Sequence, residues 1–210
     1  MYSALALGAL LGATTTSALP KIPFVSSTSV IPLKDGPVSI AGRQASSACF
    51  LIGSETLPEE TADSADALAA TVTCSSSATT IDGVPDVTSG ATTFSDIDFS
   101  QSDQTPLAFA LSQFATADPL ADTDLQTFQD SLNVYVATEA GIRSVAGDLS
   151  IKVPKFFLEM QVSRIQTAQG NAPTEAGLQV DHLLGKVLTN AAGEDQDLLD
   201  QVSQLAATLS

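Results

Sequence analysis

Three polar residues in the C-terminal half of the chain are candidates for chemistry. Glu139 falls on the apolar stripe of a long predicted helix, where the helical spacing calls for another apolar residue. Arg143 follows one turn later, so the two side chains can form an ion pair. His182 is the one histidine of the sequence, and any histidine-dependent catalysis would need it. Its place on the helical wheel, opposite the apolar stripe, favours an ordinary exposed side chain. We treat these residues as a candidate polar site.

Carboxylates on predicted helices are also the ligands of metal sites in helical bundles. Diiron sites take glutamates from several helices and two Glu-x-x-His motifs, and this chain has no such motif. We therefore expect no metal and no cofactor, and we expect Glu159 to point outward on the polar arc of its helix. Glu139 should pair with Arg143 or with a basic residue of another helix, because an unpaired buried carboxylate is costly. The helical acids considered are Glu139, Glu159, Glu175 and Asp181.

An acidic stretch around Asp96 and Asp98, with Asp103 nearby, is a second candidate for binding a cation. Calcium loops need more oxygen ligands at fixed spacing and usually a closing glutamate. We therefore expect a solvated acidic loop here.

The local motifs of several large enzyme classes are missing. The chain contains no GxSxG, HExxH, GxGxxG or P-loop pattern, and the run Gly141-x-x-Ser144-x-x-Gly147 does not have the spacing of a nucleophile turn. Two-carboxylate glycoside hydrolysis stays open because acids are abundant, although the chain has no Trp and Tyr135 falls on a core stripe. A ligand pocket between helices also stays open.

Net charge restricts the partners. The formal charge of the 210 residues is −16, and no Lys or Arg occurs between Arg43 and Arg143. Such a chain repels phosphate backbones and anionic lipid, so we expect no nucleic-acid binding and no electrostatic docking on membranes. With 44% hydrophobic and 15% charged residues the composition is globular.

The N-terminus resembles an export signal. Residues 1–18 contain a short apolar run followed by small residues, which predicts a signal peptide, with a buried N-terminal helix as the alternative. Residues 19–43 are rich in Pro and Ser, which predicts a leader segment or an extended arm. Residues 44–210 are expected to form a single mainly helical domain, with no integral membrane segment.

Cys49 and Cys74 are the only cysteines. In an exported protein an even pair favours a disulfide, with two free buried thiols as the alternative. Eight extended residues after Cys49 cover roughly 26 Å, and a helix over 58–73 returns about 24 Å. The two cysteines can therefore meet.

Helical periodicity dominates after residue 105, and the stretch 122–147 is expected to organise the core. Capping boxes at Thr56-x-x-Glu59 and Thr123-x-x-Gln126 predict two helix starts. The fold class is mainly α, a bundle of five to six helices with a small, irregular, partly β N-terminal cap. Helices are predicted at 58–73, 106–114, 122–147, 155–169, 174–190 and 194–209. Extended pieces are predicted at 49–53 and 151–153, a turn at 82–83 between short extended pieces, and loops with one or two more strands at 85–99.

Three segments resemble an uncharacterised family of small secreted fungal proteins that carry a domain of unknown function: 49–74, 132–143 and 153–157. The resemblance covers Cys49 to the C-terminus. It implies a fungal, secreted setting and supplies no catalytic residue.

The function expected from these features is that of a secreted, non-catalytic helical protein, acting outside the cell or at the cell wall. Its expected partner is an extracellular protein or a small apolar ligand. The alternative is an accessory enzyme of secondary metabolism or a metal-dependent bundle enzyme that uses Glu139.

Overall fold

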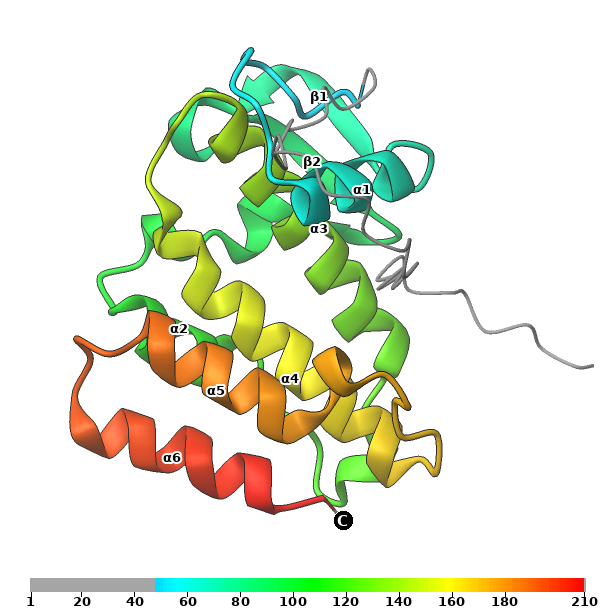
Figure 1. Cartoon of the computed structure of the whole chain (residues 1–210), viewed down its shortest axis with the longest axis vertical. Helices are drawn as coiled ribbons and strands as arrows, with labels where there is room; N and C mark the ends of the chain where they lie inside the picture. The colour runs from blue at the N-terminus through cyan, green and yellow to red at the C-terminus, as the bar shows by residue number, and fades with distance from the viewer. Residues whose placement is uncertain (1–47, 210) are drawn as a thin grey trace, which may run out of the picture.

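The computed structural model of the chain describes residues 48–209 (Figure 1). The predicted signal peptide at 1–18 and the predicted leader at 19–43 lie outside the described residues.

Six α-helices and one three-stranded antiparallel sheet form the described part of the chain. This confirms a mainly helical fold with a small β portion. None of the described helices has the length and apolarity needed to cross a membrane. The helices are α1 (Glu59–Leu68), α2 (Pro106–Gln113), α3 (Leu125–Ser144), α4 (Lys152–Ala168), α5 (Val180–Asn190) and α6 (Gln196–Ala207), and the strands are β1 (Thr73–Thr79), β2 (Pro85–Ser89) and β3 (Thr92–Thr93).

The helix α4 is the centre of the helical part. It packs against α2, α3 and α5, and α6 packs on the outer side of α5 (Figure 1). Phe157 and Leu158 are fully buried, and so is Met160. The helix α4 is therefore covered by neighbouring elements on most of its surface.

The helix α3 connects the helical part to the sheet. It packs on α4 along one side and on α1, β2 and β3 along the other. Buried Tyr135 donates a hydrogen bond from its hydroxyl to the carbonyl of Ile97 at 2.6 Å, and its ring packs edge-on against Phe94 and Phe114. Burial raises the pKa of the Tyr135 hydroxyl. Because α3 carries contacts in both directions, it fixes the position of α4 relative to α1 and the sheet.

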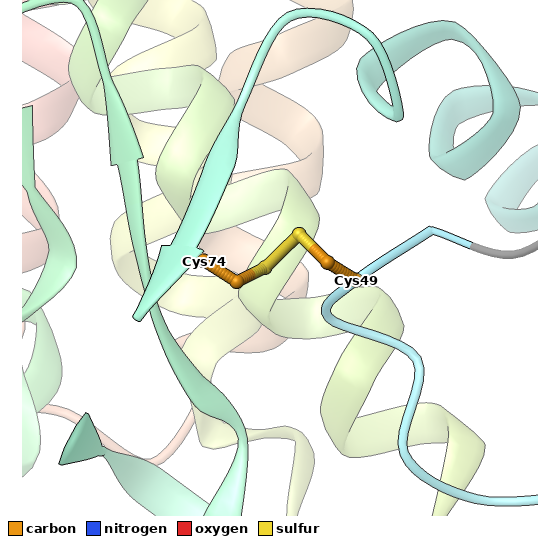
Figure 2. The surroundings of a disulfide bond; sticks show 2 residues. All are labelled: Cys49 and Cys74. Carbon is orange, nitrogen blue, oxygen red and sulfur yellow. A yellow bond between two sulfur atoms is a disulfide. The ribbon is translucent and has the colours of Figure 1, made fainter. Parts of the chain in front are cut away.

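The predicted disulfide between Cys49 and Cys74 is present. The two sulfur atoms lie 2.10 Å apart and the two Cα atoms 6.0 Å apart. Figure 2 shows that the bond joins the segment before α1 to the strand β1. A closed loop of this size stabilises the fold by about 3 kcal/mol through the entropy of the unfolded chain.

The predicted path between the two cysteines is wrong in two places. Residues 49–53 form a turn instead of a strand, with the amide of Leu51 donating to the carbonyl of Ala48 at 3.0 Å. The helix ends at Leu68, and Cys74 lies on β1. The β-branched run Thr71-Val72-Thr73 explains the early end, because such residues favour strands over helices.

The two predicted capping boxes are also wrong. Pro58 caps α1 with no side-chain hydrogen bond, so Thr56 forms no capping box. Asp124 caps α3 by accepting from the amide of Gln126 at 3.0 Å, while the hydroxyl of Thr123 accepts from the amide of Ala117. A tertiary hydrogen bond thus takes the side chain that the sequence pattern assigned to the helix start.

The starts of α4 and α5 differ from the predicted starts, and a 3-10 turn precedes each of these helices. The predicted extended piece at 151–153 belongs to a 3-10 turn, Leu149–Ile151, that runs into α4 at Lys152. Asp148 caps this turn by accepting from the amide of Ser150 at 2.8 Å. The helix predicted from 174 begins at Val180, after a separate 3-10 turn.

Candidate functional site

Glu139 on α3 is buried, with 5% of its surface exposed. Its carboxylate forms ion pairs with two basic side chains. Its Oε1 atom lies 2.7 Å from Nη2 of Arg143 on the same helix. Its Oε2 atom lies 2.8 Å from Nζ of Lys155 on α4. Both partners that the sequence left open, one on the same helix and one on another, are therefore present.

These ion pairs keep Glu139 ionised. Burial alone raises the pKa of the carboxyl, but the ammonium of Lys155 and the guanidinium of Arg143 outweigh burial and hold the pKa of Glu139 below its usual range. The carboxylate therefore carries a full negative charge in the interior. It joins α3 to α4 through Lys155.

The prediction that Glu159 points outward is wrong. Glu159 lies one turn after Lys155 on α4 and has 5% of its surface exposed. The helical wheel of α4 does place Glu159 on a polar arc beside the aliphatic stripe, but α4 has neighbours on that side too. Burial raises the pKa of Glu159 to about 7, against the opposing effect of the Lys155 ammonium. Its Oε2 atom is buried and forms no hydrogen bond with any described residue.

A pocket of about 170 Å³ opens next to Glu139, between α1, α3, α4 and α5. Most of its lining is charged, and two side chains, Val136 and Phe156, are apolar. We call it the charged pocket. The residues around it are Glu60, Thr61, Ser64, Val136, Glu139, Arg143, Lys152, Lys155, Phe156 and Lys186.

Basic residues are concentrated at this pocket. The described part of the chain contains five Lys and Arg residues, and four of them line the charged pocket. Arg143 and Lys155 are paired with Glu139. Lys152 and Lys186 form no ion pair within residues 48–209. A chain of net charge −16 thus presents uncompensated positive charge at one small pocket.

The fifth basic residue, Arg164, lies elsewhere and is almost fully buried. Its guanidinium donates to the side-chain oxygen of Gln161 and, at 2.8 Å, to the carbonyl of Thr208. Gln161 and Thr208 line a second pocket of about 470 Å³ between α2, α4 and α6. No charged side chain lines this second pocket among the described residues.

The structure does not bring His182 into the charged pocket. His182 is exposed on α5, one turn before Lys186, and only Lys186 lines the pocket. Of the three residues predicted as a polar site, Glu139 and Arg143 therefore lie together and His182 stands apart.

The lysines of the pocket were missed at the sequence level, although a signal was present. Lys152, Lys155 and Glu159 follow at spacings of three and four, which puts them on one face of a helix. The same spacing joins Glu139 to Arg143. Charged residues at these spacings on two helices are the pattern expected when the two charged faces meet at one site.

No cluster of three or more His, Cys, Asp or Glu side chains in residues 48–209 is placed to hold a metal ion. Both oxygens of Glu139 are occupied by cations. In the acidic stretch, the carboxylate of Asp98 accepts from the amide of Ser100 at 2.9 Å and so caps a 3-10 turn. These carboxylates thus have structural partners within the chain.

The run Gly141-x-x-Ser144-x-x-Gly147 anchors the segment before α1. The hydroxyl of Ser144 donates to the carbonyl of Gly141 at 2.6 Å and accepts from the amides of Ile52 and Gly53 at 3.2 and 3.0 Å. A Cβ atom on Gly141 would lie 2.6 Å from the carbonyl oxygen of Phe50. The two residues therefore allow close backbone approach, and Ser144 is held as a structural hydroxyl.

The fold and the site define a mainly helical, disulfide-linked protein with a charged pocket between four of its helices. Residues 51–210 match the family described as Domain of unknown function (DUF7143), and the chain belongs to this family. The predicted membership of an uncharacterised family is confirmed at this level. No curated protein and no solved structure matches the chain.

Proposed function

We propose that this protein is a secreted, non-catalytic protein that binds a small oxyanion in the charged pocket. The observation that carries the proposal is the concentration of four of the five described basic residues at that pocket in a strongly acidic chain. Lys152 and Lys186 have no ion pair in the described part of the chain, so their charges are available to a ligand. Charged donors of this kind bind carboxylate, sulfate and phosphate oxygens.

The volume of the pocket limits the size of the ligand. At about 170 Å³ it is comparable to the roughly 150 Å³ cavity that holds a benzene molecule in an engineered protein. A ligand of up to about eight non-hydrogen atoms fits this volume. Small carboxylates and inorganic oxyanions have this size, whereas nucleotides and lipids are too large. The charged lining favours such an anion over the small apolar ligand expected from the sequence.

The same geometry argues against Glu139 as a general acid or base. A general acid or base works best when its pKa lies near the working pH, and the pKa of Glu139 is held below its usual range. The two oxygens of Glu139 are also fixed by Arg143 and Lys155. An enzyme that uses Glu139 is therefore the less supported alternative.

Two features support secretion in the fungal setting implied by the family resemblance. The first 18 residues have the pattern of a signal peptide. The disulfide between Cys49 and Cys74 is of a kind that persists in oxidising compartments. Detection of the protein in culture medium with a mature N-terminus beyond residue 18, by mass spectrometry, would test this part of the proposal.

Calorimetric titration with sulfate, phosphate and oxalate tests the anion site, because these probes separate tetrahedral from planar oxyanions. We expect saturable binding of one class and about tenfold weaker binding in Lys152→Gln and Lys186→Gln, since each removes a charge-assisted contact worth about 1.5 kcal/mol. His182→Gln is the matched control, because His182 lies on the same helix as Lys186 but outside the pocket.

Absence of saturable binding with all three probes would overturn the proposal. An equal loss of affinity in His182→Gln would do the same, because it would show that the anions respond to general charge instead of the pocket.

A further inference from the structure

The buried carboxyl of Glu159 has no role in the proposed anion site as described so far, yet it lies among the charges of that site. The charges that act on it come from every helix that surrounds the pocket: Lys155 on its own helix α4, Glu139 on α3, Glu60 on α1 and Lys186 on α5. Its Oε2 atom is buried without a hydrogen-bond partner among the described residues. A buried, unpartnered carboxylate oxygen is costly in the ionised form.

We infer that the charged pocket takes up its anion together with a proton held by Glu159, so that anion binding is coupled to pH. This inference rests on the proposed anion site and adds its regulation. The protonated carboxyl is neutral and leaves the positive charge of the pocket intact. The ionised carboxylate opposes the incoming anion.

The charge balance of the pocket supports this coupling. The side chains that line it carry four positive and two negative charges, a net charge of two. An ionised Glu159, one turn after Lys155 on α4, reduces the local net charge to one. Ionisation of this one buried residue therefore removes half of the net positive charge that attracts the anion.

The coupling acts in both directions. A bound anion adds negative charge near Glu159 and so favours its protonated form. By linkage, the proton strengthens anion binding by the same factor. Burial already raises the pKa of Glu159 to about 7 in the free protein, so the proton is gained or lost in the mildly acidic to neutral range.

The size of the effect follows from the population of the protonated form. With a pKa of about 7, about one molecule in ten holds the proton at pH 8 and nearly all hold it at pH 5.5. If the protonated form is the binding form, the apparent affinity is about tenfold weaker at pH 8 than at pH 5.5.

Sulfate is a suitable probe because it keeps its charge across this pH range, and oxalate serves as the planar counterpart. Titration calorimetry would compare the wild-type protein with Glu159→Gln and His182→Gln, at pH 5.5 and at pH 8. The His182→Gln variant is the control, because His182 lies on α5 one turn before Lys186 and does not line the pocket.

We expect the wild-type protein and His182→Gln to lose about tenfold in affinity between the two pH values. The side chain of Gln in Glu159→Gln is neutral at pH 5.5 and at pH 8, so this variant should bind the anion tightly at both pH values. In the wild-type protein at pH 7, titrations in two buffers of different ionisation enthalpy should show uptake of about half a proton for each anion bound. This last measurement needs no variant and holds even if Glu159→Gln fails to fold.

The inference is overturned if Glu159→Gln keeps the pH dependence, if His182→Gln loses it, or if no proton is taken up. In each of these cases the anion still binds, so the proposed function survives. If neither probe binds at either pH, the proposed function itself fails.

Discussion

The side chains of the charged pocket show how one buried carboxylate can organise a site. Glu139 binds Arg143 on its own helix and Lys155 on the next, so a single carboxylate fixes two cations at a shared boundary. Lys155 also lies over the ring of Phe156, with its Nζ atom 3.9 Å from the ring centroid. The deepest cation of the pocket is thereby held in place by a charge and by an aromatic face.

Replacing Glu139 by Gln should destabilise the protein. Lys155 would be left buried without its negative partner, and breaking a buried pair from one side costs about 3 kcal/mol. Urea unfolding monitored by circular dichroism would measure this loss. Glu175→Gln, at an exposed position in the chain before α5, is the control and should leave the midpoint unchanged.

The same variant separates the two candidate functions. If Glu139→Gln leaves the unfolding midpoint unchanged but abolishes a measurable enzymatic activity, Glu139 is a catalytic residue and the binding proposal must give way to the enzymatic alternative.

At the residue scale, the sequence predicted contacts within one helix better than contacts between helices. The pair Glu139–Arg143 follows from a spacing of four. Lys155 could not be chosen among the other cations, because its approach to Glu139 depends on how α3 and α4 pack. Glu159 was placed outward because a helical wheel shows where the apolar side is and does not show how many sides are covered.

At the scale of elements, the C-terminal end of α3 acts as a platform for the segment that leads into α1. The hydroxyl of Ser144 accepts hydrogen bonds from the backbone amides of Ile52 and Gly53. The amide of Glu55 donates to the carbonyl of Ser144 at 3.0 Å. These contacts explain why residues 49–53 are not a strand. Their backbone donors are bound by a helix end, with no neighbouring strand involved.

Gly53→Ala tests this platform. A Cβ atom on Gly53 would lie 1.8 Å from the carbonyl oxygen of Ser144, so the segment would have to move away from α3. We expect a loss of stability of about 3 kcal/mol, at the high end for a single substitution. Gly177→Ala is the matched control, because nothing lies within 4 Å of its added Cβ atom.

The comparison is made by thermal or urea unfolding of both variants. Equal midpoints for the two alanine variants would show that the contact between Gly53 and Ser144 does not hold the segment.

The elements that the sequence predicted well are those whose signal is local. The helices α2 and α3 follow from apolar periodicity, and the disulfide follows from the cysteine pair. The C-terminal end of α1 was wrong because the β-branched run Thr71-Val72-Thr73 favours a strand. The cap of α3 was wrong because a tertiary hydrogen bond from the amide of Ala117 takes the hydroxyl of Thr123. The pocket itself needs four helices, and no local pattern contains it.

At the scale of the whole molecule, two buried carboxyl groups make the stability depend on pH in opposite directions. The folded state lowers the pKa of Glu139, so its stabilising contribution is present above its unfolded pKa and is lost as pH falls through the folded value. The folded state raises the pKa of Glu159. Because of the two effects together, the free energy of unfolding should be highest at a mildly acidic pH.

The sign for Glu159 follows from proton binding. Its ordinary pKa is 4.5 and its pKa in the folded protein is about 7. Between these values the folded state holds a proton that the unfolded state has lost, so the free energy of unfolding falls as pH rises through this window. Above about pH 7 both states are ionised, and the loss has reached its full size of about 3 kcal/mol.

Urea unfolding at pH 5 and pH 8 checks this prediction. The wild-type protein and the control Glu175→Gln should both be less stable at pH 8, whereas Glu159→Gln should lose most of that difference because its amide does not titrate. At pH 8 the variant should therefore be more stable than the wild-type protein. If Glu159→Gln instead shows the full wild-type decrease, the pH dependence originates in another group, and the buried carboxyl of Glu159 is ionised at lower cost than its surroundings imply.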